Sequence, residues 1–140
     1  MVNKNGFTLI EILIVMVILG LLAALVGPKM FGKVGKSRQK TAKVQISLFE
    51  TSLDTFRLDM GRYPTTEEGL EVLREKPSNS DKWDGPYIPK RIPTDPWQNP
   101  YEYKCPGEEG EYDIISYGAD GKSGGEKEDK DIVNYKDINE

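Results

Sequence analysis

The first part of the chain carries a continuous apolar run. From Phe7 to Val26 every residue is apolar or small except Thr8 and Glu11. About 20 residues in an α-helix extend roughly 30 Å, which matches the hydrocarbon thickness of a bilayer. A secretory signal has a shorter apolar core followed by a small-x-small cleavage site, and the sequence around Pro28 does not resemble one. We therefore expect a retained helix that crosses a membrane.

Beyond this run the apolar positions become periodic, with alternating steps of four and three. These positions are Ala42, Ile46, Phe49, Leu53, Phe56 and Met60. The spacing predicts one apolar face on a helix that ends at Gly61, and we expect that face to pack on a sheet of the same chain. A coiled coil is the weaker alternative, because the flanking charges are irregular. Between the two patterns, Gly27-Pro28 predicts a kink or a local loosening of the helix.

Turn-forming residues dominate the middle of the chain. Thr65 and Glu68 have the spacing of a capping box, which predicts a short second helix there. The stretch 76–100 is rich in Pro, Asp and Asn. It predicts an ordered but irregular loop that carries Trp83 and Trp97.

Alternating apolar and polar residues indicate β structure in the C-terminal part. The runs Tyr101–Cys105 and Tyr112–Tyr117 flank a turn rich in Gly and Glu, and they predict a β-hairpin. A third run at Ile132–Val133 would complete an antiparallel sheet. The predicted fold class is α+β, with a long N-terminal helix, half membrane-spanning and half amphipathic, packed on a small antiparallel β-sheet.

The composition excludes several kinds of chemistry. The chain has no histidine, which removes the usual general base at neutral pH and every Ser-His or Cys-His pair. Cys105 is its single cysteine, so an intramolecular disulfide and a Cys-ligated zinc site are impossible. We expect Cys105 to be a strand residue that packs as a small hydrophobe. A net charge of −4 argues against nucleic acid as a partner, and an enzyme is the least favoured class.

Glu11 stands out because it is the one acidic residue inside the apolar run. An ionisable group in a membrane helix is costly unless it is paired, so such a residue marks a functional site by default. The simpler interpretation is that Glu11 lies near the helix start, where the helix dipole favours an acid and the side chain can reach the headgroups. The residues alone leave both interpretations open.

The segment from Gly6 to Glu11, behind the short polar leader 1–6, resembles the class III signal of type IV pilins and pseudopilins. The stretches 61–65 and 95–101 resemble segments of the major pseudopilins of the type II secretion system, although Gln98 stands where glycine is usual. The resemblance implies a type IV pilin-like fold. It also implies that prepilin peptidase cleaves between Gly6 and Phe7 and that the Phe7 amine is methylated.

The resemblance further implies a function and a set of partners. Glu11 of one subunit would neutralise the Phe7 amine of its neighbour in a homopolymeric filament that drives export of folded proteins across the outer membrane. The implied partners are minor pseudopilins, an inner-membrane assembly platform with a cytoplasmic ATPase, prepilin peptidase, and membrane lipid before assembly. Residues 7–27 would form the transmembrane and filament-core helix, and residues 28–140 a soluble periplasmic domain. Charge counting opposes this orientation, because six basic residues between Lys29 and Lys43 follow the span.

The loop from Gly118 to Asp131 is rich in glycine and acidic residues. Such ingredients suit calcium, but no EF-hand spacing fits, and the residues alone favour a solvated turn. The loop resembles the calcium-binding loop of major pseudopilins, which implies a bound Ca²⁺. The implied ligands are the carboxylates of Asp120, Asp131 and Asp129, with Glu128 possible, and the backbone carbonyls of Tyr117 and Ser123.

Two other functions remain as alternatives. A type IV pilin or a competence pseudopilin would share the leader and the long helix, but type IV pilins commonly close a C-terminal loop with a disulfide that this chain cannot form. A monomeric single-pass membrane protein with a calcium-binding receptor domain is the alternative outside the family.

Overall fold

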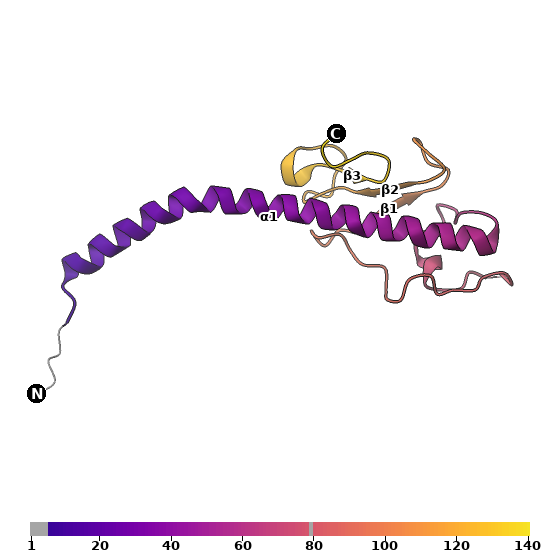
Figure 1. Cartoon of the computed structure of the whole chain (residues 1–140), viewed down its shortest axis with the longest axis horizontal. Helices are drawn as coiled ribbons and strands as arrows, with labels where there is room; N and C mark the ends of the chain where they lie inside the picture. The colour runs from indigo at the N-terminus through magenta and orange to yellow at the C-terminus, as the bar shows by residue number, and fades with distance from the viewer. Residues whose placement is uncertain (1–5, 79) are drawn as a thin grey trace, which may run out of the picture. The chain divides into compact units, whose positions relative to one another are not determined.

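The computed structural model describes residues 6–78 and 80–140, and the chain divides into two compact units, Met1–Val34 and Gly35–Glu140. Helix α1 (Leu9–Met60) contributes to both units, as Figure 1 shows. The other elements all belong to the second unit. They are two 3₁₀ helices, η1 (Glu71–Leu73) and η2 (Lys127–Asp129), and three strands, β1 (Glu102–Lys104), β2 (Asp113–Ser116) and β3 (Ile132–Val133).

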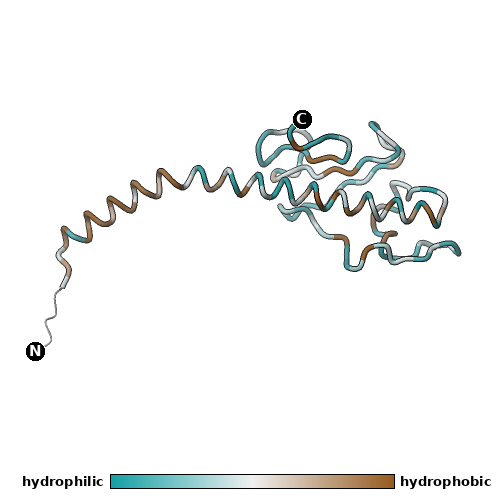
Figure 2. The backbone as a smooth tube through the Cα atoms, viewed as in Figure 1, coloured by the Kyte–Doolittle hydropathy of each residue, from teal (hydrophilic) through white to brown (hydrophobic). Residues whose placement is uncertain are grey.

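The part of α1 in the first unit is apolar and exposed. No residue between Leu9 and Val34 is buried by the chain itself. Figure 2 shows mostly brown, hydrophobic residues along the N-terminal part of the helix. By length and composition this is the one helix of the described residues that could cross a membrane. Pro28 lies inside α1 and does not end it, so the helix that the sequence predicts as two patterns is continuous.

The part of α1 in the second unit supplies one side of the core, as the periodicity predicts. Its buried residues are Gly35, Gln39, Ala42, Ile46, Phe49, Leu53 and Phe56. Phe49 meets Tyr101 edge to face at 5.1 Å between ring centroids, just before β1, while the Tyr101 hydroxyl donates to Gln45. The predicted packing of this face on a sheet of the same chain is confirmed.

The sheet is antiparallel with the order β1-β2-β3. Tyr103 pairs with Ile114, and Ser116 pairs with Ile132, so both the predicted hairpin and the predicted third strand are confirmed. Cys105 follows β1 instead of lying in it, because Pro106 behind it turns the chain away. The cysteine is half-buried and packs against the core, so the prediction is wrong for its strand position only.

The predicted second helix is reduced to a turn followed by η1. The capping box itself forms: Glu68 N donates to Thr65 Oγ1 at 3.2 Å, and Thr65 N donates to Glu68 Oε2 at 2.8 Å. Gly69 then adopts φ +64°, a left-handed conformation that ends a helical turn. The helix therefore begins as predicted but cannot extend.

The loop 76–100 is irregular, as predicted, and side chains hold it in place. The indole of Trp83 donates to the Val72 carbonyl at 2.8 Å. Asp95 is only 1% exposed and accepts hydrogen bonds from the backbone N–H groups of Trp97 and Asn99 and from the Ser116 hydroxyl at 2.6 Å. A fully bonded buried carboxylate thus ties the loop to β2.

Candidate assembly and cation sites

The start of α1 is capped by two side chains that the sequence places three residues apart. Thr8 donates to Glu11 Oε2 from its backbone N–H and from its hydroxyl, both at 2.8 Å, and Glu11 N donates to Thr8 Oγ1 at 3.3 Å. This reciprocal pair is a capping box, and it explains why the helix begins at Leu9. The Thr8-x-x-Glu11 spacing is the sequence signal of this capping box, which the charge of Glu11 alone does not indicate.

Glu11 has no basic partner among the residues that the structure describes, since no Lys or Arg nitrogen lies within 4.0 Å of its carboxylate. Its carboxylate accepts hydrogen bonds through Oε2 only, which leaves Oε1 available to a further group. Phe7 is 83% exposed beside it. Gly6 is exposed too, so the predicted cleavage position is accessible, while the rest of the predicted leader lies outside the described residues. The site can therefore accept a cation from outside the chain.

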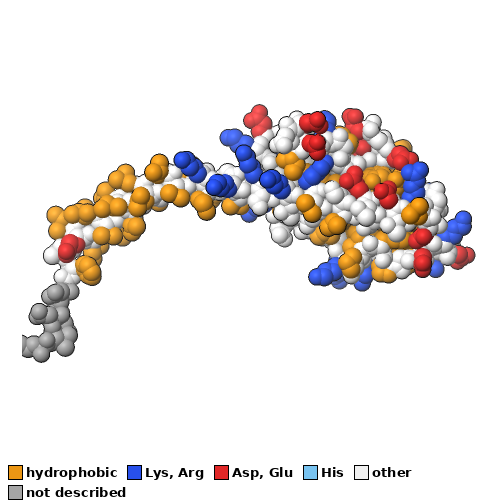
Figure 3. All heavy atoms as spheres, in the orientation of Figure 1, with side chains coloured by type: hydrophobic (Ala, Val, Ile, Leu, Met, Phe, Trp, Pro, Cys, Tyr) orange, Lys and Arg blue, Asp and Glu red, His pale blue; other side chains and the backbone are white. Residues whose placement is uncertain are grey.

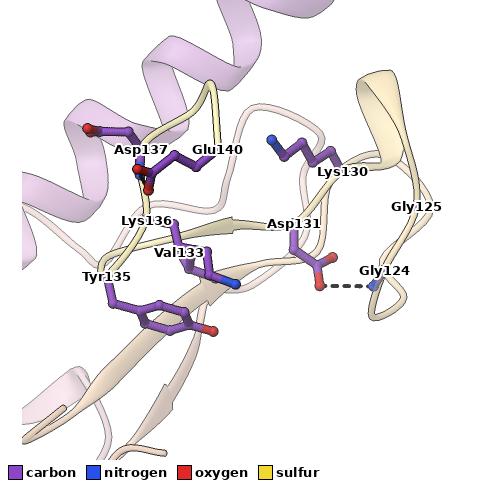
Figure 4. A pocket seen from close by; sticks show the side chains of 9 residues that line it. All are labelled: Gly124, Gly125, Lys130, Asp131, Val133, Tyr135, Lys136, Asp137 and Glu140. Atoms are coloured by element: carbon purple, nitrogen blue, oxygen red, sulfur yellow. Dashed lines mark hydrogen bonds between the residues drawn. The ribbon is translucent and has the colours of Figure 1, made fainter. Parts of the chain in front are cut away.

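The loop between β2 and β3 contains the predicted calcium ligands. Asp131 Oδ2 accepts from Gly124 N at 2.9 Å (Figure 4), whereas Asp131 Oδ1 is buried without a hydrogen-bond partner. Asp120 is exposed and accepts from Lys122 N at 3.1 Å. A cavity of about 230 Å³ adjoins Asp131 and Gly124. The unpaired oxygen of Asp131 is the strongest structural indication of a cation here, because a buried carboxylate oxygen without a partner is costly.

The other candidate ligands differ in their surroundings. The Glu128 carboxylate contacts Arg38 at 3.4 Å and the Trp97 indole at 3.3 Å, so it is already bound on the side of α1. The Tyr117 side chain bonds Glu102, which together with partial burial raises the pKa of the phenol to about 12. The Tyr117 side chain is therefore engaged elsewhere, and only its backbone carbonyl remains as the predicted donor.

A side-chain cage for a metal ion is absent from residues 6–78 and 80–140, where no three His, Cys, Asp or Glu side chains come together. A cation in this loop would need main-chain oxygens as well as carboxylates, which is a donor set that calcium accepts. Gly121, Gly124 and Gly125 all have positive φ, and this conformation lets the chain fold closely around a centre. Asp131 suits such a site better than Glu128 does, because the Glu128 carboxylate already contacts Arg38 and Trp97.

Comparison with known proteins covers nearly the whole chain. The family model "Type II secretion system (T2SS), protein G" matches residues 29–135, and "Prokaryotic N-terminal methylation motif" matches residues 1–27. "Type II secretion system core protein G" of Pseudomonas aeruginosa is 44% identical over 95% of this chain and 96% of its own. The protein of the same name from Vibrio cholerae is 45% identical, with 95% and 92% covered.

A solved structure agrees with these relatives. The major pseudopilin from the type 2 secretion system of enterohaemorrhagic Escherichia coli superimposes with a TM-score of 0.63 at 38% identity. The match covers 76% of this chain and 94% of that one. The fold is therefore type IV pilin-like, and the chain belongs to the protein G family of the type II secretion system, the family of the major pseudopilins.

Proposed function

We propose that this chain is the structural subunit of a type II secretion pseudopilus and that it polymerises through its N-terminal helix into a filament that drives export of folded proteins across the outer membrane. The observation that carries the proposal is Glu11: an acid without a basic partner among the described residues, set in a helix stretch that the chain does not bury. A stretch that is apolar all round must be covered by lipid or by other helices. The family membership supports the second of these in the assembled state.

Before assembly, the apolar part of α1 lies in the inner membrane and residues 28–140 lie in the periplasm. Prepilin peptidase cleaves between Gly6 and Phe7 on the cytoplasmic side and methylates the new Phe7 amine. The matched methylation motif over residues 1–27 supports this processing. Since the leader faces the cytoplasm, a single span puts the second unit on the opposite side.

In the filament, Glu11 Oε1 accepts a hydrogen bond from the Phe7 amine of a neighbouring subunit, while Oε2 keeps its hydrogen bonds from Thr8. The pair sets the axial register of the subunits, because an unpaired charge inside a stack of apolar helices is unfavourable. Minor pseudopilins and an inner-membrane platform with a cytoplasmic ATPase supply the remaining functions. A structural role fits the family, and the sequence contains no P-loop that would make this chain the ATPase. The family match favours this role over that of a type IV pilin or a competence pseudopilin.

The loop between β2 and β3 binds one Ca²⁺ that stabilises the second unit. The ligands are the carboxylates of Asp131, Asp120 and Asp129 with the backbone carbonyls of Tyr117 and Ser123. When bound, Ca²⁺ neutralises carboxylates that otherwise repel one another. The buried, unpaired Asp131 Oδ1 supports the site. Glu128 is the weakest candidate, because Arg38 and Trp97 already contact its carboxylate.

Chelation tests the calcium site. We expect EGTA to lower the melting temperature of the full chain in detergent, and Asp131→Asn to lower it similarly and to abolish the effect of EGTA. Glu67→Gln removes an exposed acid outside the loop and serves as the matched control, which should respond to EGTA as the wild type does. An EGTA-insensitive wild type would disprove the site.

Cross-linking in cells that carry the secretion machinery tests the assembly function. The wild type should give a ladder of multimers, and Glu11→Gln should lose it, since glutamine keeps the cap on Thr8 but removes the charge. Intact mass must show the same processing in both chains, with six residues missing and one methyl added, apart from the small mass change of the substitution itself. Glu67→Gln is again the control. Ladders that survive Glu11→Gln would overturn the proposed pairing.

A further inference from the structure

We propose that Lys29, Phe31 and Lys33 form a membrane anchor that binds anionic lipid phosphates where the apolar part of α1 ends. The anchor would hold the unassembled subunit at a fixed depth in the bilayer. This inference rests on the membrane insertion proposed above, but it concerns a different partner and a different part of the helix.

The position of the two lysines fits the headgroup layer. At 1.5 Å per residue, Lys29 lies about 5 Å and Lys33 about 10 Å beyond Val26, and the polar layer on each side of a bilayer is roughly 5–8 Å thick. Side chains on a helix point toward its N-terminus, which here means back toward the membrane. A lysine side chain can therefore extend from either position into the layer of lipid phosphates.

The charges of Lys29 and Lys33 are not used within the chain. Both residues are exposed, and neither makes an ion pair or a side-chain hydrogen bond with any residue in the described ranges. Farther along α1, Arg38 pairs with Glu128 and Lys43 donates to three carbonyls of the C-terminal segment, whereas exposed Lys36 and Lys40 also lack a partner in the described ranges. Lys29 and Lys33 differ from Lys36 and Lys40 in lying closer to the end of the apolar stretch. The space-filling view shows basic side chains appearing on α1 where the apolar surface ends (Figure 3). The ammonium groups of the two lysines thus make no polar contact within the described residues and are available to a partner.

Phe31 adds an apolar contact at the same depth as the two charges, on the opposite face of the helix. Its side chain is 75% exposed and packs on nothing in the core of the chain. Lysines on one face and an exposed aromatic ring on the other form a combination that inserts into the boundary between headgroups and acyl chains.

The sign of the charge also needs an explanation. Basic residues next to a span normally favour the cytoplasmic side, yet the proposed orientation puts Lys29 and Lys33 on the other side. Topology therefore does not account for them, whereas attraction to anionic phospholipid does. Acidic groups of a second copy are the competing partner.

Lipid retention by the full chain tests the anchor. The chain is reconstituted in vesicles that contain phosphatidylcholine and phosphatidylglycerol, released into detergent, and analysed by native mass spectrometry for bound lipid. We expect the wild type to retain phosphatidylglycerol preferentially, and Lys29→Gln with Lys33→Gln to reduce that preference roughly tenfold or more. Lys82→Gln with Lys90→Gln removes two exposed charges elsewhere and should leave it unchanged.

Each other result has a definite meaning. An equal preference for phosphatidylglycerol in the wild type and the Lys29/Lys33 variant overturns the anchor. Loss of the cross-linked ladder in that variant, with lipid retention intact, also overturns it and would assign the lysines to contacts with a second copy. The lipid assay uses unassembled chains. Its result can therefore be interpreted even if the cross-linked ladder survives Glu11→Gln and the proposed pairing is wrong. A chain that does not enter the vesicles at all would refute the proposed membrane insertion instead.

Discussion

The two parts of helix α1 differ in how the chain uses them. Between Leu9 and Val34 the helix is the more apolar of the two, yet none of its residues is buried. Between Gly35 and Met60 it is far more polar, yet seven of its residues are buried against the sheet and loops. Hydrophobicity alone therefore does not identify a core. A stretch that is apolar on every side needs a surrounding that its own chain does not supply, whereas a one-sided stripe is satisfied within the chain.

The comparison predicts its largest effect for a buried residue of the second part. Phe56 is fully buried and meets Tyr87 edge to face at 5.5 Å. Phe56→Ala should lower the free energy of unfolding by about 3–5 kcal/mol through lost burial and a cavity. Leu58→Ala is the matched control, since Leu58 is 84% exposed two residues away, and should change stability by less than about 0.5 kcal/mol. Equal effects in chemical denaturation would contradict the assignment of the core face.

A smaller effect is expected where the loop 76–100 is tied to the sheet. Asp95→Ala removes the acceptor of three hydrogen bonds and leaves the buried Ser116 hydroxyl without its partner. We expect a loss of about 2–3 kcal/mol in the free energy of unfolding. Denaturation of the variant measures the loss, and Asp84→Ala, an exposed acid in the same loop, is the control. A loss no larger than that of the control would show that Asp95 does not hold the loop.

The capping box after α1 predicts a modest pH dependence. The Arg62 guanidinium, at 2.6 and 2.8 Å, holds the pKa of Glu68 below its usual value of 4.5. Because the pKa of Glu68 is lower in the folded than in the unfolded state, the ionised carboxylate stabilises the fold at pH values above the unfolded-state pKa. This stabilisation disappears as the pH falls through the folded-state pKa. Since the Arg62 side chain is 45% exposed, we expect about 0.5–1 kcal/mol. Melting curves of wild type and Glu68→Gln should differ near neutral pH and converge below pH 4.5; a constant difference would contradict the ion pair.

The smallest expected effect is a gain. Gln98 adopts φ +74°, a left-handed conformation that suits glycine, which is also the residue usual at this position in major pseudopilins. Gln98→Gly should stabilise the second unit by about 0.5 kcal/mol, since relief of strain exceeds the added entropy of the unfolded chain. Lys90→Gly, at an exposed position in the same loop, is the control and should be neutral or destabilising. A loss of stability at position 98 would show that the glutamine is not strained.

The elements that could be predicted from the sequence are those with a period. The stripe from Ala42 to Phe56 follows from spacing, because one buried face imposes a repeat on the residues, and β1 alternates in the same way. Strands β2 and β3 are buried at every position, so β-forming residue types and flanking turn signals indicate them rather than a repeat. Gly69 shows the limit, since a capping box predicts where a helix starts and says nothing about how far it extends. Asp95 lies in a polar loop and has no pattern that predicts burial. The resemblance implies Glu128 as a possible ligand, but the place of its carboxylate beside Arg38 and Trp97 depends on contacts far apart in the sequence.

The central claim is that other copies of the chain cover the exposed first part of α1 in the assembled state. A spin label at Leu19→Cys, in a chain with Cys105→Ser, reports on this most directly, because Leu19 is 59% exposed in the single chain. We predict dipolar broadening of the spectrum on assembly, its disappearance on dilution with unlabelled chain, and its absence when Glu11→Gln is added. A narrow spectrum in assembled filaments, unchanged by dilution, would contradict the account.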